Sequence, residues 1–123
     1  MRYIWVALAG ALGAVSRYSI GRAVGVTRFP WATLTINISG SFALAAVFTT
    51  IVHRRVSADL ATAISVGFLG AYTTFSTFAW ETYDMGRTDR HGAAAAYVAV
   101  SIVGGIAAAW LGHHVTRAIV ANG

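Results

Sequence analysis

The chain has 123 residues, of which 57% are hydrophobic and only 11% are charged. An average globular chain carries roughly 25% charged residues, so this sequence lacks the charges to cover a small water-soluble domain. The composition therefore predicts an all-α membrane protein with lipid as its main solvent. Cysteine is absent, which excludes a disulfide framework, a cysteine-ligated metal site and thiol catalysis.

The net charge of +5 comes from nine basic residues, all of them arginine, against four acids. A nucleic-acid-binding protein presents such charge on a solvated basic face with aromatic side chains. Here the arginines lie between long apolar runs, as in membrane proteins. The sequence therefore predicts lipid, and not nucleic acid, as a partner.

Four runs can cross a bilayer as helices, because about 20 apolar residues span its hydrocarbon core. The predicted spans, which form one transmembrane domain, are residues 3–22, 31–52, 60–83 and 92–115. The first run reaches this length only with Arg17 near its end, where an arginine can reach the interface or face a protein-lined cavity. A secretory signal peptide cleaved after Ala7-Leu8-Ala9 is the alternative, but the apolar stretch before that motif is too short.

The arginines are divided almost equally between the two ends of the predicted bundle. One end carries Arg2, Arg54, Arg55 and Arg117, and the other carries Arg22, Arg28, Arg87 and Arg90, with Arg17 nearby as a possible fifth. Since orientation follows an imbalance of such charges, the sequence predicts insertion in both directions and an antiparallel dimer. A fixed orientation is the alternative. Two copies would supply eight helices, whereas four are too few to enclose a wide aqueous path.

The second span carries polar side chains on one face. Thr33, Asn37 and Ser41 follow one another at four-residue steps. Asn37 is the only amide within any span, and its NH2 group offers two donors. Polar groups in lipid tend to mark function, but an interhelical hydrogen bond that holds the bundle together is the more common role. The residue by itself leaves both interpretations open.

The third span has poor helix formers in its middle, where Gly67 and Gly70 are followed by the β-branched pair Thr73 and Thr74. A break here would free backbone carbonyl groups, which suit a small cation, and lipid tolerates such backbone only where protein or a cavity satisfies it. Spacing alone favours an intact glycine-rich helix. The helix broken in mid-membrane is the alternative, and it is the one that we expect from the family resemblance described below.

After this segment, Phe75 and Phe78 face one way, and Ser76, Thr77 and Glu81 add polar groups nearby. Aromatic rings have electropositive edges, and hydroxyl groups donate hydrogen bonds without a full charge. Together they suit a small, strongly hydrated anion that must lose its water and still leave. Simple packing of two phenylalanines is the alternative.

The chain resembles the Fluc/CrcB family of small bacterial fluoride channels along nearly its whole length. The similarity lies in residues 13–18 (GAVSRY), 30–37 (PWATLTIN) and 67–81 (GFLGAYTTFSTFAWE). The last segment is very specific to that family. The chain departs from the family pattern only at Ala9, Ala32 and Ala71, where glycine is usual, and Ala71 lies inside the expected break.

The resemblance implies a channel in the bacterial inner membrane that exports fluoride passively and gives fluoride resistance. The fluoride pathway that it implies comprises Asn37, the pore-lining pair Phe75 and Phe78, a polar track of Ser76, Thr77 and Glu81, and Arg17 near a vestibule. Tyr97 has no motif around it and is not assigned.

The resemblance further implies a dual-topology antiparallel homodimer with a structural sodium ion at its centre. The backbone carbonyls of Gly70 and Thr73 from both subunits would hold this ion. Some relatives pair two non-identical subunits, so a heterodimer with a paralogue is the alternative. The intact pore residues and the even arginine count favour the homodimer.

Two rival functions fit less well. A proton antiporter of the small multidrug-resistance type needs a carboxylate in its first helix, but residues 3–21 hold no acid and their one charge is Arg17. A non-transporting scaffold would have no reason to place an amide, hydroxyls and paired phenyl rings at these spacings. We see no nucleotide motif and no catalytic constellation, so we expect a channel and not an enzyme.

Overall fold

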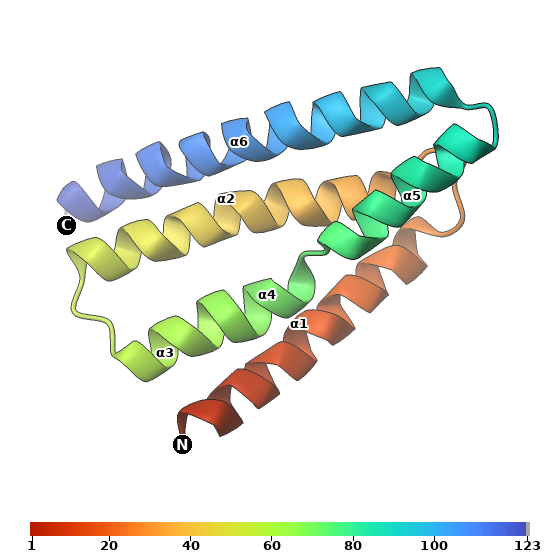
Figure 1. Cartoon of the computed structure of the whole chain (residues 1–123). Helices are drawn as coiled ribbons and strands as arrows, with labels where there is room; N and C mark the ends of the chain where they lie inside the picture. The colour runs from red at the N-terminus through yellow and green to blue at the C-terminus, as the bar shows by residue number, and fades with distance from the viewer. Residues whose placement is uncertain (123) are drawn as a thin grey trace.

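The computed structural model describes residues 1–122, which form helices joined by short connections (Figure 1). Three helices are long and apolar enough to cross a membrane. They are α1 (Arg2–Val24), α2 (Trp31–His53) and α6 (His91–Ala121). Together with the interrupted third unit they make the four antiparallel rods that the sequence predicts.

The third unit consists of four consecutive pieces, which are α3 (Ala58–Thr62), the π-helical segment η1 (Ala63–Leu69), α4 (Gly70–Tyr72) and α5 (Phe75–Arg87). The interruption lies at the two threonines and not at the glycines. Thr73 and Thr74 have extended backbone, with ψ angles of 159° and 113°. Extended backbone is the conformation that β-branched residues tolerate well. Gly67 and Gly70 stay within helical backbone.

The helices pack as two pairs, with α2 along α6 and α1 against η1 and α4. In Figure 1, α2 lies between α6 and the first half of the third unit, α3 to α4, whereas α5 contacts α6 directly. Both pairs approach closely at a glycine. A Cβ on Gly13 of α1 would collide with the carbonyl of Phe68, and a Cβ on Gly112 of α6 would collide with that of Phe42. Small residues at these points let two backbones come together in lipid.

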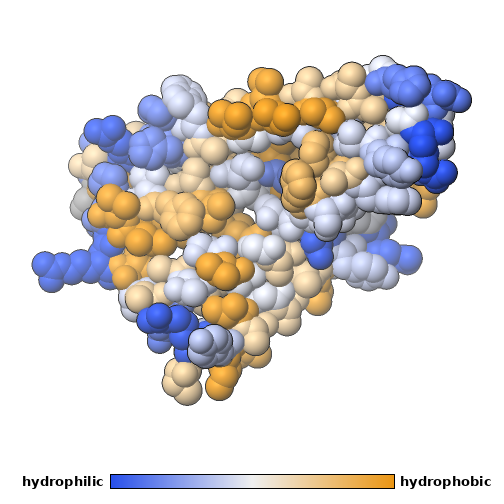
Figure 2. Space-filling model, in the orientation of Figure 1, coloured by the Kyte–Doolittle hydropathy of each residue, from blue (hydrophilic) through white to orange (hydrophobic). Residues whose placement is uncertain are grey.

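Large apolar side chains cover much of the outer surface, as expected for a protein whose solvent is lipid. In Figure 2 they gather over the middle of the visible face, and hydrophilic residues gather toward its ends. The buried cluster inside the chain is small. It consists of Leu34, Met85 and Tyr97, with Phe29, Ile38 and Phe78 packed against it.

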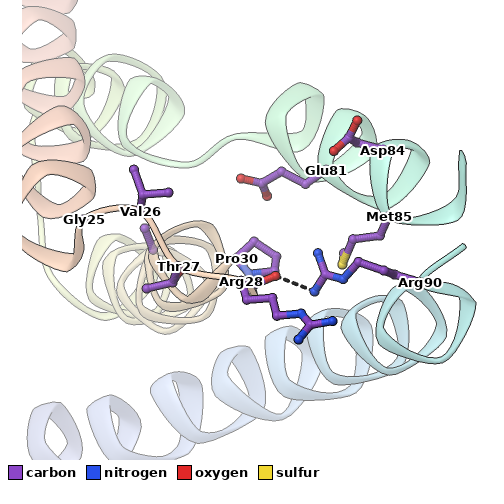
Figure 3. A pocket seen from close by; sticks show the side chains of 10 residues that line it. Gly25, Val26, Thr27, Arg28, Pro30, Glu81, Asp84, Met85 and Arg90 are labelled. Carbon is purple, nitrogen blue, oxygen red and sulfur yellow. Dashed lines mark hydrogen bonds between the residues drawn. The ribbon is translucent and has the colours of Figure 1, made fainter. Parts of the chain in front are cut away.

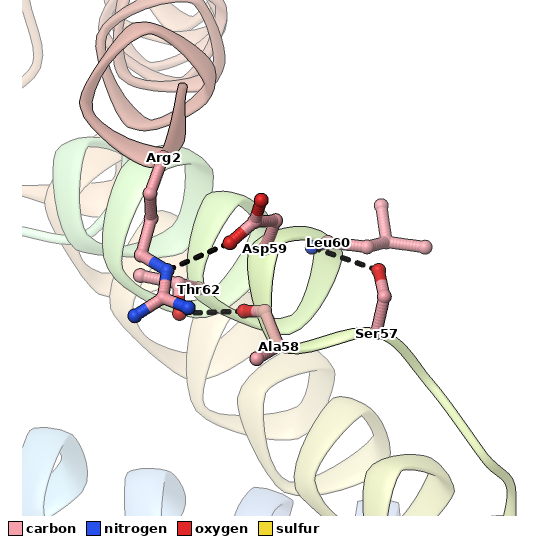
Figure 4. Close-up of polar contacts among 6 residues, drawn as sticks. All are labelled: Arg2, Ser57, Ala58, Asp59, Leu60 and Thr62. Carbon is pink, nitrogen blue, oxygen red and sulfur yellow. Dashed lines mark hydrogen bonds and ion pairs between the residues drawn. The ribbon is translucent and has the colours of Figure 1, made fainter.

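Each end of the bundle is tied by an arginine. At the end with the N-terminus, Arg2 of α1 forms a 2.7 Å ion pair with Asp59 of α3, beside the Ser57 side chain that caps α3 (Figure 4). At the opposite end, Arg90 donates a hydrogen bond to the carbonyl of Arg28. Each of these contacts joins two parts of the chain that are far apart in sequence.

Candidate ion pathway

The broken backbone of the third unit is held by Asn37 of α2. The Asn37 Oδ1 accepts a hydrogen bond from the Thr74 N–H at 2.8 Å, and its Nδ2 donates to the Thr74 carbonyl at 2.9 Å. In a continuous helix the Thr74 N–H would bond to the carbonyl of Gly70. The side chain of Asn37 therefore replaces the helical hydrogen bond that the Thr74 N–H has lost. One N–H of its amide is left for another partner.

The carbonyl groups before the break form the other half of this arrangement. The Gly70 carbonyl has lost its helical donor to Asn37, and the Thr73 carbonyl accepts a 3.3 Å hydrogen bond from Arg17 Nη1. The C-terminal end of a helix carries partial negative charge, so a cation is favoured here. The structure thus brings Arg17, Gly70 and Thr73 together, and it places Arg17 beside the break.

The helix after the break, α5, begins with its own cap. The Thr74 Oγ1 accepts from the Thr77 N–H at 3.3 Å and lies 3.0 Å from the Thr77 hydroxyl, to which it donates. Its distance to the Ser76 hydroxyl is 3.5 Å. Because Thr74 supplies that proton, the hydroxyl proton of Thr77 is free to serve another acceptor. Ser76 and Thr77 are both exposed on the surface of the single chain.

Three aromatic rings extend along α5 toward α6. The ring centroids of Phe75 and Phe78 are 5.8 Å apart, and those of Phe78 and Tyr97 are 5.1 Å apart. The pair that the sequence indicates is therefore adjacent, but the two rings differ in environment. Phe75 is 79% exposed, whereas Phe78 packs against the buried cluster around Tyr97.

The carboxylate of Glu81 lies at the end of this aromatic line. The hydroxyl of Thr33 donates to its Oε1 at 2.9 Å, and the hydroxyl of Tyr97 donates to its Oε2 at 2.7 Å. Tyr97 is fully buried and Thr33 is 5% exposed. Three helices thus contribute one polar group each to a hydrogen-bonded cluster, in which both hydroxyl protons are directed at the acid.

Two cavities flank the line of residues from Asn37 to Glu81. One cavity of about 240 Å³ is lined by Asn37, Thr73, Thr74 and Phe75, with Gly40, Ser41 and Leu44 of α2. The other has a volume of about 280 Å³ and is lined by Glu81, Asp84 and Met85 of α5 together with the residue 25–30 loop and Arg90 (Figure 3). Donors, ring edges and a carboxylate therefore lie between two hollows at different depths of the bundle.

Three residues of this line, Thr33, Thr74 and Tyr97, are not among the pathway residues that the sequence predicts. Thr74 was expected only as part of the break, but it is the contact point for Asn37 and the cap of α5. Thr33 lies on the predicted polar face of its helix but had no assigned partner. Tyr97 had no motif around it, and its contact with Glu81 depends on how α6 packs against α5. The four-residue spacing of Thr33 and Asn37 was the one available signal.

Comparison with known proteins shows the family to which this chain is related. The family model described as "CrcB-like protein, Camphor Resistance (CrcB)" matches residues 4–113. A "Fluoride-specific ion channel FluC" from Acidobacterium capsulatum is 44% identical over 98% of this chain and all of its own length.

Two further relatives match this chain with similar identity over a similar share of its length. The "Fluoride-specific ion channel FluC 2" of Geobacillus kaustophilus is 43% identical over 92% of this chain and 91% of its own length. The "Fluoride-specific ion channel FluC" of Hahella chejuensis is 41% identical over 95% of each chain. With its long apolar helices this chain is a multi-pass membrane protein, and it belongs to the CrcB family, as its three sequence motifs predict.

Proposed function

We propose that this chain is a fluoride-selective ion channel that lets fluoride leave the cytoplasm down its electrochemical gradient. The observation that carries this proposal is full-length similarity of 41–44% to relatives named as fluoride-specific channels. A channel of this kind is not an enzyme. An inside-negative membrane potential supplies about 2.3 kcal/mol per charge per 100 mV, so passive export needs no coupled energy source. The expected result for a cell is lower internal fluoride and fluoride resistance.

The proposed pathway follows the line of residues between the two cavities. Asn37 stands at one end with one free amide hydrogen, and Glu81 stands at the other. Between them, the ring edges of Phe75 and Phe78 and the hydroxyls of Ser76 and Thr77 offer weak donors. Such groups can replace part of the hydration shell of a small anion without holding it too tightly. Arg17 would act near the break, where its charge favours an approaching anion.

We assign the working unit to a dual-topology antiparallel homodimer. In a single subunit, Phe75 is 79% exposed and Ser76 and Thr77 face outward, so the proposed pathway is open on one side. A second copy would cover these groups and complete the wall. The equal division of arginines between the two ends supports insertion in both directions. A paired paralogue is the alternative partner.

The break in the third unit fits a structural sodium ion shared by two subunits. The Gly70 carbonyl has lost its helical donor, and the Thr73 carbonyl lies in extended backbone. Unwound backbone carbonyls and helix C-terminal ends are the groups that coordinate sodium in transporters. Two such carbonyls from each subunit would give four oxygen ligands. A bound ion would join the two chains at their centre.

Fluoride efflux from liposomes tests this function. Purified protein is reconstituted with potassium fluoride inside, valinomycin is added to release potassium, and a fluoride electrode follows the anion beside a matched chloride experiment. We expect fast fluoride release without chloride release. Equal release of both anions would exclude selectivity. Absence of release from monodisperse protein, restored by co-expression of a paralogue, would replace the homodimer with a heterodimer. Absence without such restoration would overturn the function.

A further inference from the structure

The cavity of about 280 Å³ next to Glu81 has the form of an aqueous mouth. It lies where the connection between α1 and α2 meets the end of α5 and the start of α6 (Figure 3). Its outer wall is a solvated loop, in which Val26 is fully exposed. Its inner wall is Glu81, which is bonded to Thr33 and Tyr97 on the pathway side. The cavity therefore connects solvent with the Glu81 end of the proposed pathway.

The charges around this mouth are unevenly compensated. Asp84 forms a 2.7 Å ion pair with Arg87, and Glu81 accepts from two hydroxyl groups. The guanidinium of Arg90 donates to the carbonyl of Arg28, which closes the loop over the cavity. Among the described residues, the guanidinium of Arg28 itself takes part in no hydrogen bond or ion pair. Arg28 is exposed and thus contributes an uncompensated positive charge.

An anion that uses this mouth must pass the negative charge of Glu81. A cation at the rim offsets that barrier and raises the local concentration of anions, because clefts focus the field of the charges that line them. From this geometry we infer that Arg28 is an electrostatic collector at the mouth of the pathway, which sets how fast fluoride enters or leaves. This inference rests on the proposed fluoride channel and adds a residue that determines its flux.

Two substitutions separate the charge of Arg28 from other effects. R28Q removes the charge and R28K keeps it, and both change an exposed side chain. R55Q is the matched control. Arg55 is also an exposed loop arginine and, among the described residues, forms no ion pair, but it lies at the other end of the bundle, between α2 and α3. Each variant is reconstituted as a full chain and checked for monodispersity before fluoride efflux is measured.

Ionic strength provides the diagnostic readout, since the Debye length is about 30 Å at 0.01 M and about 8 Å at 0.15 M. At the lower value we expect R28Q to reduce the fluoride efflux rate about two- to tenfold, with R28K and R55Q close to wild type. Raising the ionic strength to about 0.15 M with an impermeant potassium salt should largely remove the difference in efflux rate between R28Q and wild type.

Three results would overturn the inference. R28Q equal to wild type at low ionic strength would mean that the mouth needs no collecting charge. An equal loss in R55Q would assign the effect to general surface potential. A loss in R28Q that persists at high ionic strength would assign Arg28 a structural role. If the wild-type protein itself conducts no fluoride, both the proposed function and this inference are wrong. The efflux trace of the wild-type protein distinguishes this case from the other three.

Discussion

The side chain of Asn37 forms two hydrogen bonds with the backbone of Thr74, one to its N–H at 2.8 Å and one to its carbonyl at 2.9 Å. The residue is therefore a clasp for the broken helix as well as a candidate pathway donor. The two interpretations that its sequence position leaves open are compatible, because an amide has more than one donor. The position of Asn37 along α2 therefore determines where the third unit can be interrupted.

Substitution of Asn37 should affect stability and conduction together. N37A leaves the buried Thr74 N–H and carbonyl without partners, which costs about 1–3 kcal/mol per unsatisfied group. We expect a lower thermal unfolding temperature in detergent and loss of fluoride efflux. T50A, which removes a hydroxyl on the same helix that donates to the Ala46 carbonyl away from both pathway cavities, is the control. Lost efflux at an unchanged unfolding temperature would show that Asn37 acts on the ion alone.

The two phenylalanines of the proposed pathway should differ in how much each stabilises the fold of the chain. Phe78 packs against Tyr97 at 5.1 Å, whereas Phe75 is 79% exposed on the subunit. We expect F78A to destabilise the subunit by about 2–3 kcal/mol, below the 3–5 kcal/mol of a fully buried ring. F75A should leave subunit stability within about 0.5 kcal/mol and still reduce efflux. Equilibrium unfolding in mixed micelles measures the free energy of unfolding of each variant. Equal destabilisation by F78A and F75A would contradict this prediction.

The hydroxyl of Tyr97 should matter through Glu81. Y97F keeps the ring contact with Phe78 and removes the 2.7 Å donor to the carboxylate. A hydrogen bond to a charged group is worth about 1.5–3 kcal/mol, so the carboxylate should lose its fixed position. We expect reduced fluoride efflux from protein that still folds.

The variant T33V removes the second donor to Glu81 and is expected to act in the same way. Because the two hydroxyls bind one carboxylate, the double variant should differ from the sum of the single effects. Fluoride-electrode traces of all four proteins complete the cycle. Strictly additive effects would show that Thr33 and Tyr97 act independently of each other, which would contradict a shared action through Glu81.

Close packing of α1 against η1 should make Gly13 intolerant of any side chain. The added Cβ in G13A would collide with the Phe68 carbonyl, which belongs to backbone and cannot move aside cheaply. Overpacking of this kind costs about 1–3 kcal/mol. G21A is the matched control on the same helix. Among the described residues, its added Cβ would have no neighbour within 4 Å beyond the adjacent residues and the nearby backbone of its own helix. Thermal unfolding should separate the two; equal unfolding temperatures would mean that α1 can shift at no cost.

Removal of sodium should weaken the proposed dimer. The released Gly70 carbonyl and the extended Thr73 backbone suit a cation shared by two chains. We expect the unfolding temperature and the dimer fraction in size-exclusion chromatography to fall when N-methylglucamine replaces sodium at constant ionic strength. Titration back with sodium should restore both. A response to choline equal to that to sodium would indicate ionic strength and not a specific site.

Much of this protein could be predicted from its sequence by local rules. Apolar runs of spanning length determined the solvent and the helices, because about 20 such residues cross the hydrocarbon core. The pair Thr73 and Thr74 marked the region of the break, and three motifs identified the family. The three-residue spacing of Phe75 and Phe78 on one helix also predicted that their rings are neighbours. Each of these features depends only on neighbours in the chain.

The tertiary structure decided which polar group meets which. Asn37 and Thr74 are 37 residues apart, and Thr33 and Glu81 are 48 residues apart. Their contacts depend on the rotation and axial shift of one helix against another, which the close approach of helices at residues such as Gly13 and Gly112 sets. Residue spacing defines the faces of a helix but not the face it meets. For that physical reason Tyr97 was found as a partner of Glu81 only in the folded chain.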